Sequence, residues 1–210
     1  MQDILGNFEK NHAQVRFPSH VLPVCLFRTC SPVSPNPTSI TPSSSPLLPT
    51  LPPPSRNAVK SIGFDMVDVT QPSDLDTAEV LLFPGVGSFG SVMGHLREQG
   101  LVEPLRKYLQ AGRPYIGICL GMQVLFESSE ESPGVEGLGV IPGPVNEFDR
   151  SKGAAVPHIG WNGVNLHREG SGAVLTPADR FYFVHSFHVS PTEANNEWIL
   201  GSTNYAAAHG

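Results

Sequence analysis

One stretch of the chain decides the fold, and it reads Pro114-Tyr115-Ile116-Gly117-Ile118-Cys119-Leu120-Gly121-Met122-Gln123. Its apolar first part is typical of a buried strand. From Leu120 onward the apolar residues have helical spacing, with Val124 one turn further along. Cys119 stands at the junction between glycines 117 and 121. The pattern Gly-x-Cys-x-Gly is the thiol counterpart of the nucleophile elbow Gly-x-Ser-x-Gly.

This pattern predicts a reactive cysteine. A tight strand-to-helix turn strains its central residue, and the flanking glycines leave room for it. The following helix directs free N–H groups and its positive end at the sulfur, which favours the thiolate of Cys119. The N–H of Leu120 is placed to help bind an oxyanion. The alternative is that Cys119 is a buried, inert cysteine at a turn.

Strands and helices alternate before this stretch. Residues 64–69 and 79–83 have strand patterns, and helices are expected to end at Gly63, to begin near Ser88, and to span 103–112. This order predicts an α/β fold, an open and mostly parallel sheet in three layers with flanking helices. In such sheets, sites form at the carboxyl ends of strands, where Cys119 and the turn 84–87 would lie. A plain tight turn at 84–87 is the alternative.

Composition excludes several classes of function. The chain has 210 residues, 40% of them hydrophobic, and a formal net charge of −6. The acidity argues against a nucleic-acid or anionic-membrane partner. No apolar run approaches the roughly 20 residues that cross a bilayer. Three cysteines do not make a disulfide framework, and no metal-ligand spacing follows them.

Residues 1–54 differ from the rest of the chain. They are rich in proline and serine, and proline at such density blocks both helices and central strands. We expect a disordered tail over 1–54 and a folded domain over 55–210. The start of the tail lacks the basic and apolar regions of a secretory signal, so we expect a cytoplasmic protein. The alternative is an organelle, with the serine-rich tail acting as a transit peptide.

The second half is richer in β-formers. Residues 181–189 are typical of one strand, in which His185 and His188 would point to opposite faces. A structural role is favoured for both histidines over a role as base for Cys119. Trp161, near the end of a predicted strand, is typical of a core or an interface.

Several separated motifs resemble one family. Residues 55–205 resemble the glutaminase subunit or domain of imidazole glycerol phosphate synthase, a class I glutamine amidotransferase of histidine biosynthesis. The elbow is shared by many amidotransferases, whereas the combination of Pro-Gly-Val-Gly with Pro-His-x-Gly-Trp-Asn is specific to this branch. The resemblance rests on residues 82–89, 117–123, 137–143, 156–162 and 183–187.

The resemblance implies a role for each matching residue. Cys119 would attack the carboxamide of glutamine and form a glutamyl thioester. The implied oxyanion hole comprises the backbone of Gly85, Val86, Gly87 and Leu120. The implied glutamine contacts are Gln123, Glu131, Ser186 and Phe187. A (β/α)8 cyclase barrel, fused or separate, would receive ammonia and would face Trp161 and Asn162. No metal or organic cofactor is implied.

The chain also departs from the family. The family's catalytic base lies in a His-Pro-x-Glu motif and its first strand precedes residue 55, and neither is found here. His209 lacks the proline and the acidic residue of that motif. We therefore expect a chain truncated at both ends and inactive by itself. Two alternatives remain, a non-catalytic truncated or pseudo-enzyme fragment that only binds a cyclase, and another cysteine hydrolase with His185 or His188 as base.

Overall fold

The computed structural model describes residues 53–85, 87–153, 155–167 and 176–205. The predicted tail 1–54 lies almost wholly outside these ranges. Val86, predicted to contribute to the oxyanion hole, and His209 also lie outside the described residues.

Two short parallel strands carry the predicted elbow. Strand β1 spans Leu81–Phe83 and strand β2 spans Tyr115–Gly117, with Leu81 paired to Tyr115 and Phe83 to Gly117. The N–H of Ile118 donates to the carbonyl of Phe83 at 3.0 Å, which continues the ladder by one residue. The strands therefore end side by side, as parallel pairing requires.

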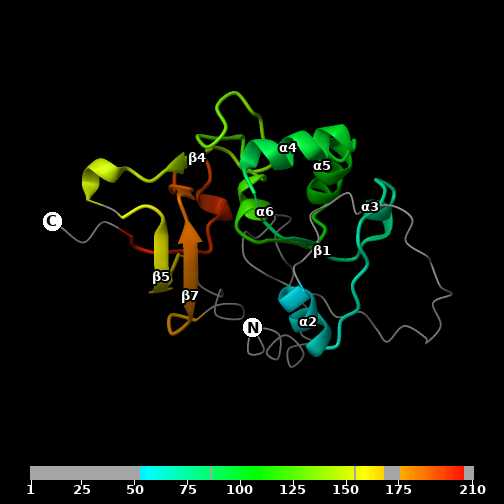
Figure 1. Ribbon diagram of the computed structural model, residues 1–210, viewed down its shortest axis with the longest axis horizontal. Helices are drawn as coiled ribbons and strands as arrows, with labels where there is room; N and C mark the ends of the chain where they lie inside the picture. The colour runs from blue at the N-terminus through cyan, green and yellow to red at the C-terminus, as the bar shows by residue number, and fades with distance from the viewer. Residues whose placement is uncertain (1–52, 86, 154, 168–175, 206–210) are drawn as a thin grey trace.

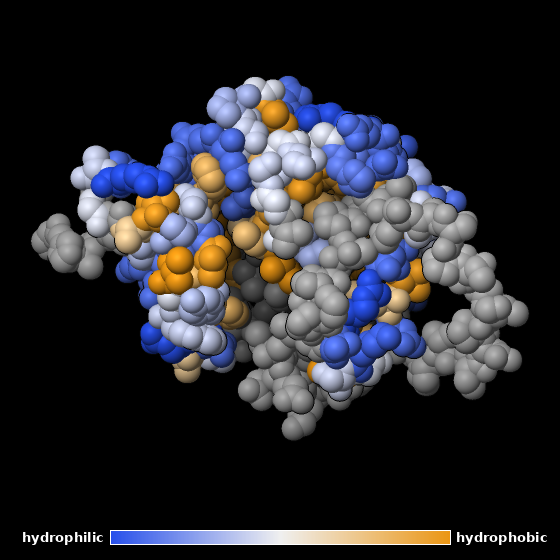
Figure 2. Space-filling view, in the orientation of Figure 1, coloured by the Kyte–Doolittle hydropathy of each residue, from blue (hydrophilic) through white to orange (hydrophobic). Residues whose placement is uncertain are grey.

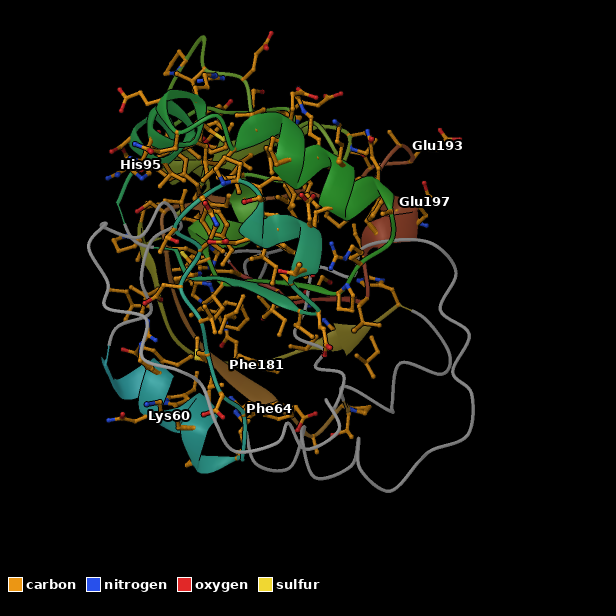
Figure 3. All side chains as sticks on the ribbon, turned by 90° about the vertical axis from the view of Figure 1, so that its right-hand side faces the viewer. Lys60, Phe64, His95, Phe181, Glu193 and Glu197 are labelled. Carbon is orange, nitrogen blue, oxygen red and sulfur yellow. The ribbon has the colours of Figure 1, made fainter. Side chains whose placement is uncertain are left out.

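Helices flank this ladder. They are α2 (Pro53–Ser61), α3 (Asp74–Thr77), α4 (Phe89–Glu98), α5 (Val102–Gln110) and α6 (Leu120–Gln123). Helices α4 and α5 lie on one side of β1 and α2 lies on the other, as Figures 1 and 3 show from two directions. In Figure 3, Lys60 of α2 lies at the lower left and Glu197 at the upper right. The α/β class with helices on both sides is confirmed.

The predicted helix ends are confirmed by their capping residues. Gly63 follows α2 with a φ of 90°, and Gly112 follows α5 with a φ of 68°, a backbone region that glycine enters without strain. Ser88 caps α4 because its hydroxyl accepts from the N–H of Ser91 at 3.4 Å. The core between α4, α5 and β1 has fully buried side chains at Phe83, Phe89, Met93, Leu96 and Leu105.

The second half is built from short strands. They are β3 (Ser128–Ser129), β4 (Pro144–Glu147), β5 (His158–Gly163), β6 (Asn165–Leu166), β7 (Arg180–His185), β8 (Phe187–His188) and β9 (Gly201–Ser202), with 3₁₀ turns η1 (Arg150–Lys152) and η3 (Asn196–Trp198). Their sheets are β3-β4-β8, β5-β7 and β6-β9. Only β3 and β4 pair in parallel in this half of the described chain; the remaining pairs are antiparallel.

Two strand predictions differ from the structure. Residues 64–69 form no strand; their burial alternates, with Val67 92% exposed, but they have no ladder partner within the described ranges. The predicted strand 181–189 is broken at Ser186 into β7 and β8. Because of this break, His185 and His188 both contact the ring of Phe148, with centroids 5.2 and 4.3 Å away. The prediction that they point to opposite faces is therefore wrong.

Helix α6 lies unusually close to β1. A Cβ atom added to Gly121 would lie 2.1 Å from the carbonyl oxygen of Phe83. A Cβ atom added to Gly117 would lie 2.6 Å from the carbonyl oxygen of Gly121. The buried hydroxyl of Tyr115 donates to the Gly121 carbonyl at 2.5 Å. Glycine is therefore required at both positions by close approach of backbone to backbone.

We predict that Gly121→Ala destabilises the chain by about 3 kcal/mol, because the contacted atom is a main-chain oxygen that cannot move aside. The matched control is Gly94→Ala in α4, where an added Cβ meets nothing within 4 Å. This control is expected to stabilise by about 0.5–1 kcal/mol, since alanine is the better helix former. Urea unfolding of the two variants checks the difference, and equal effects would contradict it.

Candidate active site

Cys119 occupies the strained junction that its sequence pattern predicts. Its φ is 52° and its ψ is −110°, and within the described ranges it alone among non-glycine residues has a positive φ. Such a conformation costs free energy and persists only when neighbouring structure enforces it. Here the enforcing contacts are the Ile118–Phe83 hydrogen bond before the cysteine and the Gly121–Phe83 contact after it. The side chain is exposed and carries a free thiol.

The loop after β1 lies directly against this junction. A Cβ atom added to Gly85 would lie 2.3 Å from the backbone nitrogen of Leu120 and 2.4 Å from the carbonyl oxygen of Ile118. Gly87, two residues further, has a φ of 98°. The structure therefore brings Gly85 and Leu120 together beside Cys119.

The electrostatics of Cys119 differ from the prediction. The pKa of the thiol is raised from its ordinary value, first by desolvation against surrounding protein atoms, although solvent still reaches the side chain. The N–H of Leu120 opposes this by hydrogen-bonding to the sulfur, and the charge of Glu131 adds to the increase. Helix α6 has only four residues, so its dipole is weak. The raised pKa favours the neutral thiol over the predicted thiolate.

Glu131 connects the site to helix α4. One of its carboxylate oxygens accepts from the N–H of Phe89 at 2.7 Å, and the neighbouring hydroxyl of Ser132 accepts from the N–H of Gly90 at 2.9 Å. With the Ser88 cap, these contacts satisfy the first backbone donors of α4. The residue predicted to contact glutamine therefore also fixes the helix that follows the Gly85–Gly87 loop.

Cys119 opens into a cavity of about 960 Å³. The elbow side of this cavity includes Met122 and Gln123, and the side chain of Gln123 is 6% exposed. The opposite wall is formed by strands β7 and β8 and includes Phe187. Of the predicted glutamine contacts, Gln123 and Phe187 thus line the same cavity as the thiol. Ser186 lies next to this wall, and its carbonyl accepts from the N–H of Phe148 at 3.2 Å.

An aromatic and histidine cluster forms part of this cavity, and the sequence did not predict it. The ring of His158 stacks on Phe183 and on Tyr205, with centroids 4.9 and 3.8 Å apart. Its Nδ1 lies 3.1 Å from Nε2 of His185. His158 and His185 are directly paired across β5 and β7, so their side chains lie on the same face of the sheet. Knowledge of this strand register would have been needed to predict the cluster.

Trp161 and Asn162 lie on opposite faces of β5. The outer face of the β5-β7 sheet exposes four large apolar side chains, with Trp161 63% exposed; they are Ile159, Trp161, Tyr182 and Val184. The rings of Trp161 and Tyr182 meet edge to face at 5.6 Å. Figure 2 shows apolar atoms gathered over this part of the molecule. Asn162 instead points inward, and its amide nitrogen lies 2.9 Å from Nε2 of His158.

Two general features complete the description. In the part of the chain that the structure describes, no three His, Cys, Asp or Glu side chains are grouped so that they could hold a metal ion. No helix of that part is both long and apolar enough to cross a membrane.

Comparisons with known proteins agree with the elbow motif. The chain is 46% identical over 150 residues to the chloroplastic imidazole glycerol phosphate synthase hisHF of Arabidopsis thaliana, covering 71% of this chain and 25% of that protein. It is 42% identical to hisHF of Schizosaccharomyces pombe, covering 70% and 30%. It thus spans about a quarter to a third of these relatives.

Shorter relatives match over more of their length. The imidazole glycerol phosphate synthase subunit HisH of Methanothermobacter thermautotrophicus is 41% identical, over 71% of this chain and 72% of that protein. A solved glutamine amidotransferase structure covers 62% of this chain at 21% identity and a TM-score of 0.47. The sequence model of the class-I glutamine amidotransferases matches residues 56–209. This chain therefore belongs to the glutamine amidotransferase class-I family.

Proposed function

We propose that this chain is the glutaminase half of an imidazole glycerol phosphate synthase. It would hydrolyse glutamine through a thioester on Cys119 and supply ammonia to a cyclase barrel in histidine biosynthesis. The observation that carries the proposal is the elbow itself, where the strained Cys119 has the Leu120 N–H at its sulfur and the Gly85 loop in contact. The relatives named hisHF and HisH favour the imidazole glycerol phosphate synthase branch of the family.

The chemistry requires two acyl-transfer steps. The sulfur of Cys119 attacks the carboxamide carbon, and the carbonyl oxygen gains negative charge that the Leu120 N–H stabilises. The carbon–nitrogen bond then breaks, and the thiol proton leaves with the nitrogen as ammonia. Water attacks the thioester, releases glutamate and returns a proton to the sulfur. We expect further backbone donors to the oxyanion to come from the loop that begins at Gly85, because Gly85 lies against the backbone nitrogen of Leu120.

The charge of Glu131 offers a minor link between substrate binding and the reactivity of the thiol. Desolvation is the main cause that raises the pKa of Cys119 in the free protein, and the charge of Glu131 adds to it. The α-ammonium group of glutamine, bound beside Glu131, would offset that charge. This part of the increase in the pKa of the cysteine would then be removed as the substrate arrives, while the desolvation remains.

The reading that uses His185 as the general base is not favoured. Nε2 of His185 lies 3.1 Å from a ring nitrogen of His158, and Nδ1 lies 2.8 Å from the carbonyl oxygen of Phe187. Both nitrogens are therefore occupied in this conformation, and neither is free to accept the thiol proton.

The outer face of β5-β7 is the surface that we assign to the cyclase barrel. Four large apolar side chains, all more than half exposed, lie together there. Aromatic anchors of this kind are typical of interface hot spots. Trp161 is expected to make the main contact, whereas Asn162 faces the cavity side.

A diazoketone analogue of L-glutamine is expected to alkylate Cys119, because the cavity brings the substrate's reactive carbon to the sulfur. Intact-mass and peptide mapping would show one adduct, absent from Cys119→Ala and suppressed by excess L-glutamine. The D-enantiomer is the control reagent. Equal labelling of Cys25 and Cys30, or labelling that glutamine does not suppress, would contradict the proposal.

Alkylation of Cys119 by iodoacetamide is expected to be slow at pH 7 and to accelerate with pH up to and beyond the ordinary thiol pKa. The rate is expected to rise with pH because burial raises the pKa of the thiol and only the thiolate reacts. The rate should rise about tenfold per pH unit below the pKa. A rate that stays level between pH 6 and 8 would show that the thiolate is already formed.

Trp161→Ala is expected to weaken binding to a separately expressed cyclase barrel about 10- to 100-fold, as truncation of an aromatic hot spot does. Titration calorimetry measures the change. The matched control is Val67→Ala, another exposed apolar residue that lies outside the β5-β7 face. Similar losses for both variants would show that the barrel does not bind this face.

A further inference from the structure

A chain of hydrogen bonds crosses the inner side of the β5-β7 sheet. Nδ2 of Asn162 lies 2.9 Å from Nε2 of His158, and Nδ1 of His158 lies 3.1 Å from Nε2 of His185. Nδ1 of His185 lies 2.8 Å from the carbonyl oxygen of Phe187. The side chain of His158 is 1% exposed, so water does not replace these contacts easily.

The last member fixes the direction of every bond. A carbonyl oxygen can only accept, so Nδ1 of His185 carries a hydrogen and donates to Phe187. In a neutral ring, Nε2 of His185 then accepts, and Nδ1 of His158 must donate to it. Nε2 of His158 is left as an acceptor, which the amide nitrogen of Asn162 satisfies. All members are satisfied in one arrangement, with both histidines neutral.

The chain ends at the wall of the cysteine cavity. Phe187 belongs to β8, pairs with Glu147 of β4, and lines the cavity together with Cys119. The preceding carbonyl, that of Ser186, is held from the other side by the N–H of Phe148. The peptide between Ser186 and Phe187 is therefore fixed at the bend that separates β7 from β8.

We infer that His158 and His185 are positioning residues that hold the Ser186–Phe187 backbone in the geometry that binds glutamine, and that they do so best while the ring of His158 is neutral. The inference rests on the proposed function, because it assigns these residues to the glutamine site. Neither histidine touches the reacting atoms; both act through the backbone of β8.

A proton added to His158 would disturb the chain. On Nε2 of His158 it would face the N–H of Asn162 as the amide is placed, so the bond re-forms only if the amide turns over to present its oxygen. Burial and the neighbouring His185 both lower the pKa of His158, in agreement with a neutral ring. Other titratable groups on the cavity are Cys119, Glu147, Asp149, Tyr182, His188 and Tyr205. Burial also lowers the pKa of His188, so it needs its own control.

The first test uses the wild-type chain and the diazoketone analogue of glutamine. The concentration for half-maximal inactivation is expected to rise about three- to tenfold as pH falls from 7 to 5, since His158 ordinarily titrates near 6.5 and the lowered pKa moves the loss to more acid pH. Iodoacetamide, which needs no glutamine site, is run in parallel to report the thiol alone. A half-maximal concentration that stays constant over this range would overturn the inference.

The second test uses a variant in which protonation of His158 should no longer weaken binding of the analogue. In Asn162→Asp a carboxylate accepts from Nε2 of His158, so the protonated ring now completes the chain instead of disturbing it. The half-maximal concentration should therefore stay nearly constant between pH 7 and 5 in this variant. His188→Gln and His167→Gln are the controls; His167 is exposed and contacts Ser202 away from the cavity. Both are expected to keep the wild-type dependence.

The outcomes separate the inference from the proposed function. If Asn162→Asp keeps the wild-type dependence, or if His188→Gln abolishes it, the histidine pair does not position the site. Failure of the analogue to label Cys119 at every pH would instead contradict the proposed glutaminase function, on which the inference rests.

Discussion

The contact between Gly121 and the carbonyl of Phe83 is the constraint on which the rest of the site depends. It brings the first turn of α6 against the end of β1, and the chain can reach it only by turning sharply at Cys119. The same closeness places Gly85 on the backbone of Leu120. A strained cysteine, a donor at its sulfur and a neighbouring glycine loop therefore all follow from one backbone approach that side chains would prevent.

Apart from the strand expected at 64–69, the sequence predicted the elements of this half of the molecule well, because their signals are local. A glycine beyond the last turn, a serine before the first one and two glycines around a cysteine each act within a few residues. Gly63, Gly112 and Ser88 end or begin helices where expected. The thiolate predicted for Cys119 is not favoured, because its pKa is raised first by desolvation against surrounding protein and then by the charge of Glu131, twelve residues away, and no local pattern describes either cause.

The second half was predicted less well because its geometry depends on pairing between distant strands. Residues 181–189 contain only good strand formers, so nothing local announces the bend at Ser186. The bend is stabilised by two hydrogen bonds. The N–H of Phe148 donates to the carbonyl of Ser186, and Nδ1 of His185 donates to the carbonyl of Phe187. Segment 64–69, in the first half of the chain, also depends on a distant partner. Its exposed and half-buried side chains alternate as in a strand, but no neighbouring strand among the described residues pairs with it.

The protonated state of Cys119 has a consequence for the life of the protein under oxidation. Peroxides attack thiolates much faster than thiols, and the first product, a sulfenic acid, can proceed to irreversible acids. A raised pKa keeps more of the cysteine in the thiol form and so slows this damage, even though solvent reaches the side chain. The desolvation that is expected to slow alkylation would therefore also slow oxidation.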